Sequence, residues 1–263
     1  MSHFSVLVIG NDVERILEPY DENIEVTPYI GRPAYIVERD FRRHQATCFK
    51  KQLDGETLDA FDEFTLSLNK VAADWWKEWS GESLDIEGNA LTTDNPNAKW
   101  DWYSIGGRWM GALILKGGAE GKLGEPGVFG DPPLHDADIT TIGDVDWVAM
   151  NKLAKEHSAK EWDTLFKPYD NHEFCLYNKD YVEKQKTVHL EIYGTKEEYV
   201  RRRGFWTTYA LVTEDEWIAP GEMGLFGLST DETTDREAYD NKFVSYLKSL
   251  PKDTPITVVD CHI

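Results

Sequence analysis

Cysteine is scarce in this 263-residue chain, which holds Cys48, Cys175 and Cys261 far apart and has no Cys-x-x-Cys pair. Their odd number and wide spacing argue against a structural zinc site and a disulfide framework, and a chain without disulfides is typical of a reducing compartment. The chain also lacks a run of about 18 apolar residues, the length that a membrane span requires. Its first residues lack the basic start and the cleavage site of a signal peptide. We therefore expect a cytoplasmic protein with no membrane partner.

Positive charge is also in short supply, because 28 Lys and Arg residues oppose 48 Asp and Glu and the net charge is −20. Such a surface repels nucleic-acid backbones, so we expect no direct nucleic-acid binding. The acidity indicates either ordinary solubility or mimicry of a polyanion, in which carboxylates occupy the nucleic-acid site of another protein. Basic islands at residues 32–51 and 201–203 argue against a pure mimic. The chain has no GxSxG elbow and no GxGxxG fingerprint, so the common hydrolase and nicotinamide-binding folds are not supported.

Apolar residues, by contrast, are plentiful at 41% of the chain, with 13% aromatic, which is enough for one large domain. Residues 4–9 (FSVLVI) and 256–263 (ITVVDCHI) predict buried strands near the two ends of the sequence. Residues 205–218 alternate, turn at an acidic pair and alternate again, which predicts a hairpin. Apolar residues at three- and four-residue steps predict helices at residues 55–79, 144–162, 195–203 and 235–250. Capping-box pairs mark two helix starts, Thr195 with Glu198 and Thr234 with Glu237.

These elements favour an α+β fold in a single domain spanning residues 1–263. The first strand and the C-terminal third together follow the strand–helix–strand–strand–helix–strand order of a ferredoxin-like antiparallel sheet formed by both chain ends. On this interpretation, residues 30–204 form a large, mainly helical insertion. The alternative is a mixed sheet with more strands, which would include residues 34–38 and 109–116.

Four short sequence motifs carry a family resemblance. They are the opening SHFSVLVIG, the central NPNAKWDWYSIGGRW, the GEMG after Pro220 and the closing TPITVVDCHI. Together they span the chain, and they resemble a family of uncharacterised proteins found largely in bacteriophage genomes. That family has no assigned activity, so the resemblance implies a setting. The setting is a non-structural accessory protein that works in the cytoplasm of the bacterial host and acts against host defences.

The central segment, residues 95–111, gathers four large aromatic residues around one acid and one base. As a structural element, its Arg108 would pair with Asp101 and stack on an indole ring. As a binding site, Arg108 would hold a phosphate or a carboxylate while an indole stacks on a flat base. The second interpretation predicts a site for a nucleotide-like small anion or for a host protein. Its candidate residues are Asn95, Asn97, Trp100, Asp101, Trp102, Tyr103, Arg108 and Trp109.

The two ends of the chain offer a second constellation. If the first and last strands are antiparallel neighbours, His3 lies beside Asp260 and His262. Side chains alternate along a strand, so Asp260 and His262 share one face while Cys261 points to the other. Two imidazoles and a carboxylate can hold a divalent metal such as Zn²⁺, and they can also act as an acid–base pair. Polar residues at strand ends can equally bond to backbone or water. No other cofactor is indicated.

Three functions follow from these residues, and they leave open whether the protein is an enzyme. The first is a binding protein that takes a nucleotide-like anion or a host protein through the Trp/Arg-rich segment. The second is an acidic decoy that inhibits a nucleic-acid-binding defence enzyme of the host. The third is a metal-dependent hydrolase that uses His3, Asp260 and His262.

Overall fold

The computed structural model describes residues 2–52, 71–168, 179–223 and 233–263. It divides into two compact units, one made of Met1–Asp21 with Asn97–Ile263 and the other of Glu22–Pro96. The predicted single domain is therefore two units in the structure. The predicted insertion at 30–204 also has other bounds, because residues 97–204 belong to the unit that holds both chain ends. Within the described ranges, no helix combines the length and the apolar character that a membrane span requires.

Helices and strands are mixed along the chain, which confirms the α+β class. The strands are β1 (His3–Ile9), β2 (Tyr29–Arg32), β3 (Ser83–Leu84), β4 (Ala90–Thr92), β5 (Trp102–Gly107), β6 (Glu125–Pro126), β7 (Ile139–Thr141), β8 (Ala210–Val212), β9 (Trp217–Ile218) and β10 (Pro255–His262). The α-helices are α1 (Val13–Leu17), α2 (Ala34–Gln52), α4 (Val71–Ser80), α5 (Trp147–Phe166), α6 (Lys179–Tyr193), α7 (Lys196–Arg203) and α8 (Thr233–Ser249), and a 3-10 helix, η1, spans Glu18–Tyr20.

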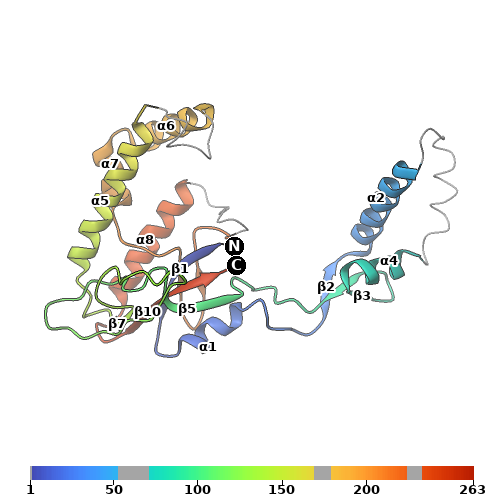
Figure 1. Ribbon diagram of the computed structural model, residues 1–263, viewed down its shortest axis with the longest axis horizontal. Coiled ribbons are helices and arrows are strands. Elements are labelled where there is room, and N and C mark those ends of the chain that lie inside the picture. The colour runs from blue at the N-terminus through green and yellow to red at the C-terminus, as the bar shows by residue number, and fades with distance from the viewer. Residues whose placement is uncertain (1, 53–70, 169–178, 224–232) are drawn as a thin grey trace. The chain divides into compact units, whose positions relative to one another are not determined.

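The larger unit is built on a seven-stranded sheet among the described residues, in the order β6-β5-β10-β1-β8-β9, with β7 also paired to β10. β1 runs antiparallel to β10 along its whole length, from His3 opposite His262 to Ile9 opposite Ile256. The two chain ends therefore lie next to each other, as Figure 1 shows. This confirms that the first and last strands are neighbours in one sheet.

The ferredoxin-like detail is not confirmed, because β8, the first strand of the C-terminal hairpin, pairs with β1, and β9 lies outside it. In a ferredoxin-like sheet the second strand of the corresponding hairpin lies next to the first strand of the chain. The observed sheet is instead mixed and has extra strands, as the alternative prediction held. The extra strands are β5, β6 and β7, however. Residues 34–38 begin helix α2, and residues 109–116 form isolated bridges at Leu113 and Leu115 instead of a strand.

Each face of this sheet is covered by different helices. On one face, Leu7 and Val258 pack with Met150 of α5 and Phe243 of α8. On the other face, the strands pack against α1, whose residues Ile16 and Leu17 are buried there. Because β-strand side chains alternate, successive residues of β1 and β10 enter opposite cores. We call the first of these faces the α5/α8 face and the second the α1 face.

The predicted helices begin where local chemistry favours it. α7 begins after Thr195, whose hydroxyl accepts a hydrogen bond from the backbone N–H of Glu198 at 3.2 Å, and Gly204 caps its end. α5 begins after Asp146, which accepts from two backbone N–H groups of the first turn. Asp and Thr are favoured at such positions because their side-chain oxygens satisfy free N–H groups. Of the predicted helix at 55–79, only α4 lies within the described residues.

The smaller unit carries a three-stranded sheet in the order β2-β4-β3. Its core gathers Val37 of α2, Trp76 of α4 and Ala90 of β4. The Trp76 indole N–H is satisfied by the carboxylate of Glu82 at 2.9 Å. One aromatic side chain thus joins a helix, a strand and the segment between α4 and β3.

Candidate functional site

The strand register brings the two terminal histidines together, as predicted. His3 of β1 lies directly opposite His262 of β10, and Trp102 of β5 lies opposite His262 on its other side. Residues directly opposite in an antiparallel pair share a face of the sheet. Asp260, two residues before His262, is on the same α5/α8 face. We call His3, Asp101, Asp260 and His262 the paired-histidine cluster.

Each imidazole of this cluster is held by its own carboxylate. Nδ1 of His3 lies 2.9 Å from Oδ1 of Asp260, and Nδ1 of His262 lies 2.6 Å from Oδ1 of Asp101. An ionised carboxylate only accepts hydrogen bonds, so each ring carries its proton on Nδ1 toward its partner. The two ring centroids are 5.0 Å apart at an angle of 75°. Such pairing fixes the orientation of both rings and leaves their Nε2 atoms for another task.

Asp260 is the most enclosed member of the cluster, with its side chain 2% exposed. Its second oxygen, Oδ2, accepts the backbone N–H of Arg108 at 3.0 Å. The close approach of the Asp260 side chain to this backbone requires glycine at position 107, because a Cβ there would lie 2.4 Å from the Cβ of Asp260. Gly107 also has a φ of +56°, a region that glycine adopts without strain. The turn after β5 therefore positions the Asp260 carboxylate, which in turn binds His3.

Two buried polar atoms in this region have no hydrogen-bond partner among the described residues, Nε2 of His262 and Oγ of Ser104. Ser104 lies opposite Asp260, on the same face of the sheet as His262. Buried polar side-chain atoms are normally satisfied, so unpartnered ones indicate a place for a further polar group. The sequence alone did not single out Ser104, since a serine in an aromatic segment carries no distinctive pattern.

The aromatic residues of the central segment do not share one surface. Trp100 is 6% exposed, its indole N–H donates to the carbonyl of Leu17 at 3.1 Å, and Tyr103 packs edge-to-face against it. Trp102 is 49% exposed, and its ring centroid lies 6.3 Å from that of His3. Alternation along β5 produces this division, because Trp102 and Tyr103 point to opposite faces. Of the β5 aromatics, Trp102 alone adjoins the paired-histidine cluster.

The predicted ion pair between Asp101 and Arg108 does not form in the structure. Asp101 bonds to His262, whereas the side chain of Arg108 is exposed and its backbone N–H binds Asp260. The two asparagines fall in different units, with Asn95 in Glu22–Pro96 and Asn97 in the unit of the chain ends. The predicted ligand-binding residues are thus divided among a core, a cluster and a separate unit.

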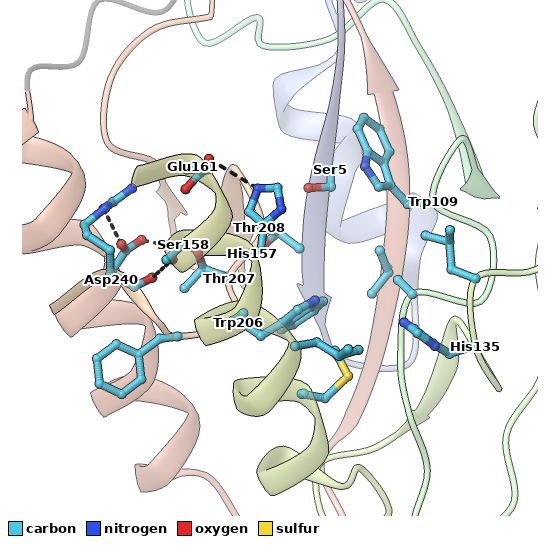
Figure 2. Close-up of a pocket in the computed structure, with 18 of the residues that line it drawn as sticks. Ser5, Trp109, His135, His157, Ser158, Glu161, Trp206, Thr207, Thr208 and Asp240 are labelled. Atoms are coloured by element: carbon cyan, nitrogen blue, oxygen red, sulfur yellow. Dashed lines mark hydrogen bonds and ion pairs between the residues drawn. The ribbon is translucent and has the colours of Figure 1, made fainter. Parts of the chain in front are cut away.

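A pocket of about 390 Å³ lies on the same α5/α8 face as the cluster. Ser5, two residues from His3 on β1, lines it together with Trp109, the last of the predicted aromatic residues. Figure 2 shows His157 and Glu161 entering the pocket from α5. The volume is within the range of about 300–1,000 Å³ that is typical of small-molecule sites.

The predicted metal site is only partly assembled. His3, Asp260 and His262 do meet, but Asp260 directs its two oxygens to His3 and to the backbone of Arg108. Throughout the described ranges, no group of three or more His, Cys, Asp or Glu side chains has an arrangement that could hold a metal ion. Cys261 lies on the opposite face, fully buried, and this burial raises the pKa of its thiol well above the usual value.

Comparison of this chain with family models, curated proteins and solved structures gives no match. The resemblance to phage proteins therefore stays a prediction that these comparisons do not test.

Proposed function

We propose that the protein is a hydrolase and that the paired-histidine cluster is its acid–base site, acting on a small phosphoester of the nucleotide type. The observation that carries this proposal is the pair of histidine–carboxylate contacts with ring centroids 5.0 Å apart. Histidine is the side chain best suited to exchange protons near neutral pH, and a carboxylate on Nδ1 orients the ring and stabilises its charged form.

In this proposal His3 is the group that exchanges the proton. Its Nε2 takes a proton from a water molecule as the water oxygen bonds to phosphorus. The same proton then passes to the leaving oxygen as the phosphorus–oxygen bond breaks, so His3 ends the cycle in its starting state. Asp260, held by the backbone of Arg108, stabilises the imidazolium between these two steps. The neighbouring pair of His262 and Asp101 supports the orientation of the His3 ring.

Two exposed side chains give the proposal its substrate class. The half-exposed indole of Trp102, next to His3, offers a flat surface on which a base can stack. The exposed guanidinium of Arg108 offers a positive charge for a phosphate. In the setting implied by the phage resemblance, the activity would belong to an accessory protein that acts against a host defence in the host cytoplasm.

Turnover of phosphoesters tests the proposal. We expect hydrolysis of bis(4-nitrophenyl) phosphate or of a cyclic nucleotide by the wild-type protein in the presence of a chelator. His3→Asn should lower kcat by about 10²–10⁴-fold, the usual contribution of a general acid–base. His44→Asn is the matched control, because this exposed histidine belongs to the smaller unit, outside the cluster and the pocket. No turnover of any phosphoester, or equal turnover by His3→Asn, would contradict the proposal.

A second candidate is a metal-assisted hydrolase at the same residues. Histidines that bind metals usually donate their other ring N–H to a carboxylate, as both rings do here, and Nε2 of His262 has no hydrogen-bond partner among the described residues. His3 and His262 would hold the ion through Nε2, and the ion would supply activated water. Metal analysis of tag-free protein separates the candidates. A protein that is free of metal, active and insensitive to chelators removes this second one.

A further inference from the structure

We infer that the pocket on the α5/α8 face is a binding site for a small, flat organic monoanion, with Arg236 as the group that recognises the negative charge. The inference does not depend on hydrolysis at the paired-histidine cluster. It rests on the ion pairs around α8, on an N–H of Arg236 that has no hydrogen-bond partner among the described residues and on the aromatic residues of the pocket lining.

Three arginines lie near Glu237 and Asp240 where α7 meets α8. Arg202 forms a two-pronged ion pair with Glu237, including a contact of 2.7 Å from its Nε to Oε1. Arg203 forms an ion pair with Asp240, whose side chain is 3% exposed. Arg236 is the third cation, and the carboxylate within its reach, Asp240, is already paired. Glu237 and Asp240 are thus hydrogen-bonded to Arg202 and Arg203, and Arg236 is the least satisfied of the three arginines.

Arg236 is poorly satisfied by the residues around it. Its Nε lies 3.5 Å from Oδ1 of Asp240, but it is buried and makes no hydrogen bond to any described residue. The guanidinium carbon lies 5.5 Å from the centroid of the Tyr239 ring, and the whole side chain is 24% exposed. Asp240 Oδ1 instead accepts from the hydroxyl of Thr207 at 3.2 Å. A mostly buried guanidinium with an unused N–H, lining a pocket, is suited to a carboxylate or phosphate oxygen.

The remaining lining decides the shape and the charge of the ligand. Trp109, Phe205 and Trp206 supply aromatic surface, which favours a flat apolar body. Glu161, the other acid of the lining, pairs with His157 at 3.2 Å and accepts from the Tyr199 hydroxyl. Both acids of the pocket thus have polar partners of their own, whereas Nε of Arg236 has none among the described residues. A carboxylate on the ligand would accept from this N–H group, so we expect a ligand with one anionic group.

A matched pair of probes tests the inference by isothermal titration. 2-Naphthoate and 2-naphthamide have nearly the same shape and differ in charge. We expect wild-type protein to bind 2-naphthoate about tenfold or more tightly than 2-naphthamide, since charge-assisted hydrogen bonds are the strong ones. Arg236→Gln should remove this preference and leave the affinity for 2-naphthamide unchanged. Arg236→Lys, which keeps the charge without the planar fork, should retain part of it.

Arg201→Gln is the control, because it removes a positive charge from the same region at an exposed residue paired with Glu198. This variant should keep the full preference for 2-naphthoate. A wild-type protein that binds neither probe, or that binds both equally, would overturn the inference, and so would an unchanged preference in Arg236→Gln. His3→Asn should bind 2-naphthoate like wild type, which separates this site from the proposed catalytic one.

Discussion

The two faces of the sheet at the end of β1, β10 and β5 make an instructive comparison. Both are built from the same short pieces of sequence, HFS, DCHI and DWYS, taken at alternate residues. On the α5/α8 face lie His3, Asp260 and His262, where His3 is hydrogen-bonded to Asp260 and His262 to Asp101. On the α1 face lie Phe4 and Cys261, which are buried in an apolar core.

The difference teaches that composition along the chain does not separate site from core in this molecule. Strand alternation separates them, because neighbouring residues enter environments of opposite polarity. Three consecutive residues thus lie on two faces of the sheet. Asp260 and His262 are on the α5/α8 face, and Cys261 is on the α1 face. Substitutions on one face at a time therefore show how much each face contributes to stability.

Replacing the buried carboxylate should have the largest effect on stability. Asp260→Ala removes the partner of both the His3 ring and the backbone N–H of Arg108. Breaking a buried hydrogen-bonded pair on one side costs about 3–5 kcal/mol, because the groups left behind stay desolvated. Urea unfolding measures this loss. Asp260→Asn, which can still accept from Arg108, should lose clearly less, and a loss equal to that of the alanine variant would argue against the assigned contacts.

Gly107→Ala should have the next largest effect, although it leaves every polar group in place. The new Cβ would overlap the side chain of Asp260, and the left-handed backbone also disfavours alanine. The two effects together should cost about 2–4 kcal/mol in unfolding free energy. Gly118→Ala is the matched control, because Gly118 has a φ of +83° and open space around its Cβ. If both variants lose the same stability, the close approach of Asp260 to Gly107 is refuted.

Much of this architecture could be predicted from the sequence where the signals are local. The terminal strands are continuous apolar runs, and the antiparallel pairing of two such strands is enough to place His3 beside His262. The helix start at Thr195 follows from its capping chemistry in the same way. These features depend on neighbouring residues and on the regular geometry of one strand pair.

The rest depends on contacts that the sequence does not display. The partner of His262 is Asp101, which directly precedes β5, and the dense aromatic segment around this strand does not predict it. α2 and α6 were missed because charged residues interrupt their apolar spacing, and residues 34–38 resemble a strand because they begin with a short continuous apolar run. The pocket is harder still to predict from the sequence, since its lining residues, such as Trp109 and Arg236, come from distant parts of the chain.

On the α1 face, Cys261→Ser should cost about 1–3 kcal/mol, because it buries a hydroxyl in an apolar core. The thiol itself should resist modification in the folded protein, which is measured with a thiol reagent in a Cys48→Ser, Cys175→Ser background. Burial, and next the charge of Asp260, raise the pKa of Cys261 above its usual value. A raised pKa stabilises the fold below about pH 8.5, where the unfolded thiol is protonated, and this stabilisation is lost at higher pH. Rapid labelling at pH 8 would contradict the burial.

The smallest effect on stability is expected from Trp102→Ala, on the side of β5 that faces His3. This indole is half-exposed and its removal leaves no sealed cavity, so the unfolding free energy should fall by less than about 1 kcal/mol. The adjacent Tyr103→Ala should cost about 3 kcal/mol or more, because that ring packs against buried Trp100 in the α1-face core. The two variants remove aromatic rings one residue apart, so the difference between their unfolding free energies measures the division of the segment directly. Equal losses would mean that both rings are structural, and the stacking surface proposed at Trp102 would then lose its support.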